Sequence, residues 1–209
     1  LDIANELPKL KKVEDTKWLK EVNAQSLQAS LRHLDNAYTK FFKKTGGFPK
    51  FKKRGGHDSC SFPQDVSLEG DKIWLPKFKT PVKIALHRPF VGEMKTVTVS
   101  RNKAGRYFAS ILVETPDIIP AKPPVRNAIG IDLGLTSFAV LSDGSEITNP
   151  TFYRKTEKRI GVLQKRFDRK VSGSKNREKA RLAFARLHEA VSNRRKDFLN
   201  KASTKIVRE

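Results

Sequence analysis

Asp132 is the residue of this sequence whose position most suggests chemistry. It lies in the run AIGIDLGL, residues 128–135, where apolar residues and glycines surround a single carboxylate. Buried strands rarely carry a carboxylate that lacks a partner. Because side chains alternate along a strand, Asp132 and Gly134 share one face, and the glycine leaves room beside the carboxylate. This pattern favours a divalent cation or a phosphate as the ligand.

Two kinds of phosphate chemistry use a strand of this type. Ribonuclease-H-like nucleases begin with such a strand, and two-metal nucleases hold ions about 3.5–4 Å apart that clamp the attacking and leaving oxygens. The actin and heat-shock ATPase fold also begins with an Asp-Leu-Gly strand, which a phosphate-binding hairpin follows. An ATP-binding domain would explain the IDLG run but not the charge of the chain. A strand Asp with a purely structural role is the third interpretation.

The chain carries a large excess of positive charge. Its 209 residues include 43 Lys and Arg against 22 Asp and Glu, a formal net charge of +21. Such an excess usually matches a polyanion, most often nucleic acid, and an anionic membrane surface is the alternative. We find no apolar run long enough to span a bilayer and recognise no signal peptide. We therefore expect nucleic acid and not a membrane as the partner of this charge.

Basic residues gather in two parts of the sequence. The stretch KFFKKTGGFPKFKKR, residues 40–54, interleaves cations with aromatic rings and has no acidic residue, and residues 154–209 hold 19 Lys and Arg against 6 Asp and Glu. Cations can neutralise phosphates while rings stack on bases or sugars. A solvated loop whose Phe residues enter the core is the simpler alternative for residues 40–54. The residues predicted to contact nucleic acid are Lys43, Lys44, Lys50, Lys52, Lys53, Arg54, Arg159, Lys165, Arg166, Arg169, Arg194 and Arg195.

Helical periodicity appears at both ends of the chain. Over residues 16–44, apolar residues recur at spacings of three and four, which predicts a helix that buries this stripe. We expect Asn23 to cap the helix and Gly46-Gly47 to end it. Two more helices are predicted over about 154–170 and from about 176 onward, with SGSK between them. The apolar stripe of the first helix consists of Leu27, Leu31, Leu34, Tyr38 and Phe41.

Strand signals fill the middle of the chain. Residues 72–113 contain four runs rich in β-branched and aromatic residues, with the hairpin turn NKAG between the last two, which predicts a small antiparallel sheet or barrel. A proline-rich stretch at 115–125 indicates a linker. After it, AIGIDLGLTSFAVLSDGSEI predicts strand, short turn, strand, Asp-Gly turn and strand. The predicted class is α+β and multidomain, with a helical segment (1–44), a small antiparallel β domain (45–125) and an α/β domain (126–209).

Three segments in this order resemble the TnpB family, the transposon-encoded RNA-guided DNA endonucleases related to compact type V CRISPR effectors. WLKEVNAQSLQASLRHLDNAYTKFFK followed by GFPKFKKR resembles the helical and wedge-domain part of that family. AIGIDLGLTSFAVLSDG resembles its first RuvC motif, and RRKDFLNKASTKIVRE resembles the helix that leads to the second. The resemblance covers nearly the whole chain.

The resemblance implies a RuvC (ribonuclease-H-like) domain with Asp132 as the first catalytic carboxylate and as a ligand of Mg²⁺ or Mn²⁺. It implies a guide RNA and target double-stranded DNA as partners, and a cytoplasmic, prokaryotic-type protein that associates with the nucleoid. The family's second and third carboxylates and its four-Cys structural Zn²⁺ site are not found in this chain, so we expect an internal piece of a longer reading frame that does not cleave DNA by itself. A nuclease-dead RNA-guided repressor is the alternative reading. The oligomeric state and the guide RNA do not follow from the sequence.

Overall fold

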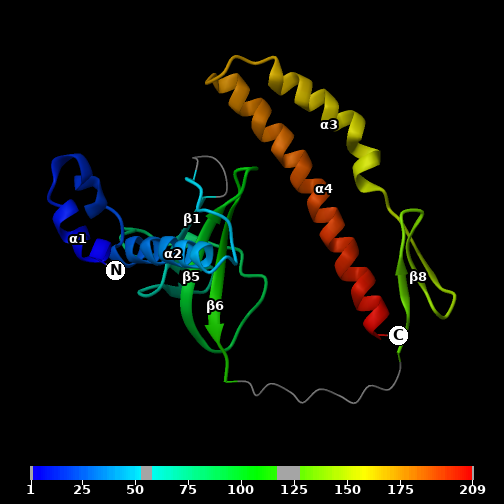
Figure 1. The fold of residues 1–209 in the computed structure, drawn as a ribbon, viewed down its shortest axis with the longest axis horizontal. Coiled ribbons are helices and arrows are strands. Elements are labelled where there is room, and N and C mark those ends of the chain that lie inside the picture. Colours follow the sequence, from blue (N-terminus) through cyan, green and yellow to red (C-terminus); the bar gives the residue numbers. More distant parts are fainter. Residues whose placement is uncertain (1, 53–57, 117–127, 209) are drawn as a thin grey trace. The chain divides into compact units, whose positions relative to one another are not determined.

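The chain forms two compact units, which are described separately. The computed structural model describes residues 2–52, 58–116 and 128–208. The first unit comprises Leu1–Ile118 and the second Ile119–Glu209. Both combine α-helices with small antiparallel sheets (Figure 1), so the predicted α+β class is confirmed at this level.

The first unit begins with three short helical elements. They are α1 (Asp2–Leu10), the 3-10 helix η1 (Glu14–Lys20) and α2 (Ala24–Phe42). Asn23 caps α2 as predicted, because its side-chain oxygen accepts a hydrogen bond from the backbone N–H of Ser26 at 3.0 Å. The predicted helix over 16–44 is therefore two elements. The prediction that Gly46-Gly47 ends it is wrong, since Lys44 supplies the left-handed residue with φ 55°.

The apolar stripe of α2 is only partly buried. Leu27 and Leu31 are half-buried, whereas Leu34 and Tyr38 remain 43% and 36% exposed. The prediction that the whole stripe lies in the core is wrong for its C-terminal half. That half ends in an aromatic cluster in which the ring of Phe48 packs edge-on against Tyr38 at 5.8 Å.

Two three-stranded antiparallel sheets complete the first unit. One has the order β1-β5-β6 and the other β2-β3-β4. The predicted NKAG turn is confirmed, because Asn102 exchanges backbone hydrogen bonds around it and Gly105 has φ 81°. The four predicted strands are present, and β1 and β2 were not predicted. The strands are β1 (Asp58–Phe62), β2 (Ser67–Glu69), β3 (Lys72–Trp74), β4 (Val82–Lys83), β5 (Glu93–Arg101) and β6 (Tyr107–Glu114).

A small core holds these strands together. Phe62, Ile73, Leu75 and Val97 form one buried cluster, with Ile73 and Val97 at 1% and 0% exposure. β1 contributes through its pairing with β5, in which Phe62 lies opposite Val97. The polar sequence DSCSF carries little strand signal by itself, so this partner 35 residues later along the chain determines its conformation.

The second unit is a three-stranded sheet followed by a helical hairpin. The sheet has the order β7-β8-β9, and both pairings are antiparallel, as predicted. The Asp143-Gly144 turn is confirmed by φ 85° at Gly144. The strands are β7 (Ile131–Leu133), β8 (Ser137–Leu141) and β9 (Glu146–Thr148), and the helices are α3 (Phe152–Asp168) and α4 (Lys175–Arg208).

The two predicted helices are present, and the structure packs them against each other. Ile160 of α3 and Val191 of α4 are both 5% exposed. At the far end of the hairpin, the rings of Phe167 and Phe184 stack with centroids 6.5 Å apart and an interplanar angle of 2°. Ser174 begins α4, because its hydroxyl oxygen accepts a hydrogen bond from the N–H of Arg177 at 3.1 Å.

Candidate nucleic-acid interface and carboxylate site

Asp132 lies in the middle of β7, the edge strand of the second unit's sheet. It pairs with Val140 of β8, which pairs in turn with Glu146 of β9. Residues directly opposite one another in an antiparallel sheet share a face, so Asp132 and Glu146 lie on the same face with Val140 between them. We expected a carboxylate buried in an apolar strand. This is wrong for the described residues, because all three β7 residues are exposed, including Leu133 at 69%.

Gly134 permits the sharp turn that follows Asp132. A Cβ added there would lie 3.0 Å from the backbone oxygen of Ser137. The N–H of Gly134 donates to the backbone oxygen of Phe138 at 3.3 Å, which closes the turn between β7 and β8. The structure therefore gives this glycine a backbone role, whereas the sequence suggested only that it leaves space for a ligand.

Asn149 connects this turn to the beginning of α3. Its side-chain nitrogen donates to the backbone oxygen of Leu135 at 2.8 Å, and its side-chain oxygen accepts from the N–H of Thr151 at 3.1 Å. Thr151 precedes α3 with a left-handed φ of 46° and makes no side-chain cap. One half-buried amide thus fixes both the turn beside Asp132 and the start of the helix. Sequence reasoning missed this residue.

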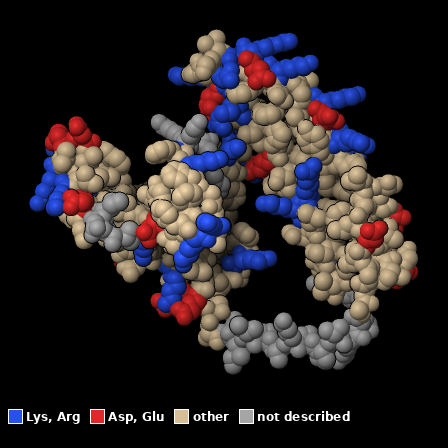
Figure 2. Space-filling view, viewed as in Figure 1, with Lys and Arg blue, Asp and Glu red and all other residues tan. Residues whose placement is uncertain are grey.

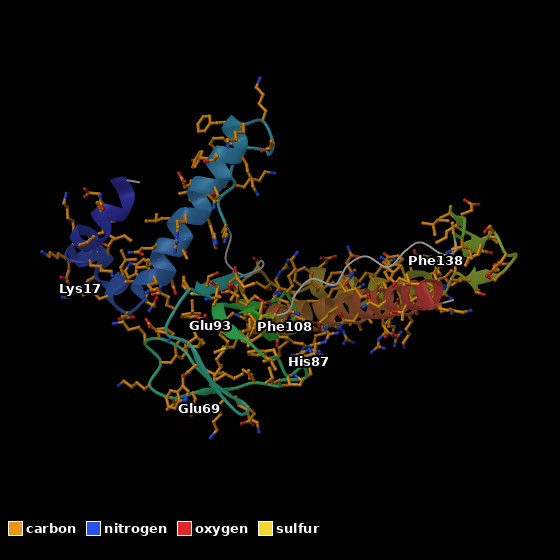
Figure 3. The ribbon with its side chains drawn as sticks, turned by 90° about the horizontal axis from the view of Figure 1, so that it is seen from below. Lys17, Glu69, His87, Glu93, Phe108 and Phe138 are labelled. Atoms are coloured by element: carbon orange, nitrogen blue, oxygen red, sulfur yellow. The ribbon has the colours of Figure 1, made fainter. Side chains whose placement is uncertain are left out.

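Three phenylalanine rings hold the sheet against the helical hairpin. Phe138 of β8 packs edge-on against Phe198 of α4 with ring centroids 5.0 Å apart. Phe152, the first residue of α3, lies 6.1 Å from the same ring. Phe138 is labelled in Figure 3, where it lies beside the C-terminal, red part of α4. The strand pair that contains Asp132 is therefore fixed to both helices.

The described residues do not fit a complete metal site. Within residues 2–52, 58–116 and 128–208, no three His, Cys, Asp or Glu side chains come together as a metal centre would need. A single exposed carboxylate does not hold two divalent ions. Asp132 can therefore supply one carboxylate of such a site, and no chemical step follows from this chain's described residues alone.

Helix α3 carries a concentration of positive charge on one side. Lys and Arg side chains project from it on the side away from α4 (Figure 2). A surface depression of about 390 Å³ lies along its C-terminal half, lined by Val162 and four cations. Three of these cations were predicted contacts, and Arg159 lies on the same side of the helix. Sequence reasoning missed Lys155, Lys158 and Lys170, although their helical spacing could have revealed them. The four lining cations are Lys165, Arg166, Arg169 and Lys170.

Two cations of α4 have partners within the second unit. Arg195, a predicted contact, lies over the ring of Tyr153 at 6.0 Å, which turns it toward α3. Arg181 pairs with Glu178 at 2.7 Å, an interaction that raises the pKa of its guanidinium. Arg194, the other predicted contact on α4, is exposed.

In the first unit, the predicted contacts follow α2. Lys43, Lys44, Lys50 and Lys52 are all exposed, and Lys53 and Arg54 lie outside the described residues. The aromatic residues among them do not enter the core. The exposed fractions of Phe42, Phe48 and Phe51 are 74%, 61% and 100%, so the simpler alternative for this stretch is wrong for these three residues. Exposed rings next to cations suit contact with nucleotides.

No helix in the described part of the chain combines the length and the apolar character that crossing a membrane requires.

Comparison with known proteins identifies the relatives of this chain. Residues 110–209 match the family model OrfB_IS605, described as "Probable transposase". The "Putative RNA-guided DNA endonuclease" of Streptomyces pristinaespiralis is 41% identical over 207 residues, which are 97% of this chain and 51% of that protein. The resemblance to the TnpB family is confirmed. The "Putative RNA-guided DNA endonuclease InsQ" of Escherichia coli (strain K12) is 36% identical over 206 residues, 98% of this chain and 50% of that protein.

The TnpB-type resemblance extends over both units. The family match covers the described parts of the second unit, including Asp132, α3 and α4, together with part of β6. The two relatives also cover nearly all of the first unit, with its exposed rings and cations. The chain spans about half the length of these relatives.

Proposed function

We propose that this chain is part of an RNA-guided DNA endonuclease of the TnpB type. The observation that carries the proposal is the 41% identity to a relative named as such an endonuclease over 97% of the chain. The relatives' names favour a nuclease over the ATP-binding alternative. The net charge of +21, with unpaired cations along α3, supports binding to guide RNA and target double-stranded DNA.

In this proposal, Asp132 is the first carboxylate of a RuvC-like metal site. The strand, tight turn, strand order around it and its exposed position on β7 support that role. The other ligands of Mg²⁺ or Mn²⁺ would come from the part of such proteins that this chain does not cover. When bound, the ions would supply charge stabilisation at the scissile phosphate, and Asp132 would contribute one oxygen ligand.

The exposed basic and aromatic residues after α2 would form a second nucleic-acid contact. Lys43, Lys44, Lys50 and Lys52 supply charge, and Phe51 offers a fully exposed ring. This combination suits an unpaired or distorted nucleic-acid strand, in which phosphates and base faces are both accessible.

The test is an Asp132→Ala variant of the complete protein, assembled with its guide RNA. Loss of one metal ligand removes charge stabilisation of several kcal/mol, so cleavage should fall by about 10²-fold or more. Guided DNA binding should persist, because phosphate contacts and base pairing supply the affinity. Asp143→Asn, a change to a carboxylate in the β8–β9 turn, is the matched control and should cleave normally.

Three other outcomes would contradict the proposal. Full cleavage by Asp132→Ala would remove Asp132 from the active site. Guided binding without cleavage by the unmodified protein would identify a nuclease-dead repressor. ATP binding with weak affinity for RNA would favour the actin-type interpretation.

A further inference from the structure

The cations of α3 follow a seven-residue repeat. Positions 155, 162 and 169 recur every seven residues, and the Lys-Arg pair at 158–159 recurs at 165–166. On an α-helix these spacings place all of them on one face. Val162 is the one apolar member of this face. We call its cations the α3 stripe, of which Arg169 and Lys170 directly follow the last helical residue, Asp168: Lys155, Lys158, Arg159, Lys165, Arg166, Arg169 and Lys170.

The α3 stripe is free of internal partners. All seven side chains are exposed, and none makes an ion pair or a side-chain hydrogen bond with the residues that the structure describes. The two acidic residues of α3, Glu157 and Asp168, lie outside the repeat. Uncompensated repulsion among seven neighbouring cations is unfavourable, so an external anion would relieve it.

An anionic membrane does not suit this helix. A surface-bound amphipathic helix inserts its apolar face between lipids. The apolar face of α3 is already used, because Ile160 is 5% exposed and Phe167 stacks on Phe184 of α4. Only the cationic face remains available, and it suits a hydrophilic polyanion.

The spacing of charge along the α3 stripe matches one strand of nucleic acid. Seven cations lie between residues 155 and 170, a span of 15 steps or about 23 Å at 1.5 Å per residue, so their average spacing along the helix is about 3.8 Å. One strand of a DNA duplex carries one phosphate per roughly 3.4 Å of axis, whereas the two strands together carry one per 1.7 Å. The stripe therefore has enough charge to match a single backbone along its length.

We propose that the α3 stripe binds the sugar–phosphate backbone of one strand of a nucleic-acid duplex. The contact extends about two turns of the α-helix on each side of Val162. This inference rests on the proposed function and specifies the surface and the mode of contact. Val162, 61% exposed within the depression of about 390 Å³, lies where a sugar ring would sit between phosphates. In this mode the Lys and Arg side chains contact phosphates, so the contact depends on backbone shape and charge.

The neighbouring helix provides a matched control. Lys175, Lys179, Arg186 and Lys196 of α4 are also exposed and are free of ion pairs among the described residues, but they are spread over 21 steps, or about 32 Å, with an average spacing of about 10 Å. The test variant replaces Lys158, Arg159, Lys165 and Arg166 with Gln. The control variant replaces the four α4 cations with Gln. Both lose four positive charges, and Gln retains helix propensity.

The experiment measures binding of the full chain to labelled 25-base-pair probes of arbitrary sequence at several salt concentrations. One probe is a DNA duplex, one is an RNA–DNA hybrid, and an acidic phospholipid vesicle is the third ligand. Each lost phosphate contact lowers the slope of log K against log salt by about 0.9. The test variant should lose about 3–4 units of slope, and the control variant about one or less. Raising the salt from 50 to 200 mM should therefore weaken binding of the test variant by a factor that is roughly 10²-fold smaller than for the unmodified chain.

The probes identify which duplex the stripe binds. The quantity compared is the difference in salt slope between the unmodified chain and the test variant. If it is larger on the RNA–DNA hybrid, the stripe binds a guide–target heteroduplex; if it is larger on DNA, the stripe binds the target duplex. Equal slope losses for test and control variants would overturn the inference, because net charge alone would then explain binding, and the proposed function would stand. Absence of duplex binding by the unmodified chain, or binding only to vesicles, would overturn both.

Discussion

Replacing Asn149 tests whether one amide positions the turn beside Asp132. In Asn149→Ala, two hydrogen bonds are lost, the one to the backbone oxygen of Leu135 at 2.8 Å and the one from the N–H of Thr151 at 3.1 Å. Each such bond contributes about 0.5–1.5 kcal/mol net, and a half-buried site lies in the lower part of that range. We therefore expect a local loss of about 1–2 kcal/mol.

Amide hydrogen exchange measures this loss at the two ends of the bridge. The N–H of Gly134, bonded to Phe138, reports on the turn, and the N–H of Lys155, bonded to Thr151, reports on the start of α3. A loss of 1.4 kcal/mol corresponds to about tenfold faster exchange through local opening. Both amides should exchange several-fold to tenfold faster in Asn149→Ala.

Asn149→Asp separates the two bonds. Aspartate still accepts from the N–H of Thr151, and its charge is favourable at a helix N-terminus, but it cannot donate to the oxygen of Leu135. The amide of Lys155 should therefore be protected as in the unmodified chain, while that of Gly134 exchanges faster. Unchanged exchange at Gly134 in both variants would refute the assignment of Asn149 as a positioning residue.

Two further predictions concern the two units. Phe198→Ala removes the ring that packs on Phe138, and because Phe198 is half-buried the unfolding free energy should fall by about 2–3 kcal/mol, less than for a fully buried Phe. Urea unfolding followed by hydrogen exchange at β8 measures this loss, with Leu199→Ala as the exposed control. A loss no larger than that of the control would contradict the packing. In the first unit, the hydrogen bond from Lys95 lowers the pKa of Glu114 below its ordinary 4.5, so this pair stabilises the unit above pH 4.5 and the contribution disappears as the pH falls through the lowered pKa. Thermal unfolding of Lys95→Gln should therefore show a weaker decline below pH 4.5 than the unmodified chain, and identical acid profiles would argue against the pair.

The sequence predicts those elements whose signals are local. The NKAG and Asp-Gly turns, the Asn23 cap and the break between α3 and α4 all depend on residues within a few positions of one another, and all are present. β1 was missed because its polar residues become a strand only through pairing with β5. The end of α2 was misplaced because Lys44 accepts a left-handed conformation that usually favours glycine.

The position of Asp132 on a strand was predicted, but its environment was not. The spacing around Asp132 indicates a strand, but the number of strands beside it depends on long-range pairing, and the structure places it on an exposed edge. The partner of Asn149 lies 14 residues earlier in the chain, so no short-range pattern reveals the bridge. In contrast, the repeat on α3 is visible in the sequence once the helix is assumed, because it depends on spacing alone.

Two aromatic contacts, one at each end of the helical hairpin, require equal lengths of α3 and α4 between them. Phe152 and Phe167 are 15 residues apart in α3, and Phe184 and Phe198 are 14 apart in α4, so both intervals measure about 21–23 Å. Inserting one residue into α3 would rotate every later cation by about 100° and misalign the two ring contacts. Inserting seven residues into each helix would rotate the later side chains about the helix axis by only about 20° and lengthen the hairpin by about 10.5 Å. Relatives that differ in the length of this hairpin should therefore do so in steps of seven residues, in both helices at once.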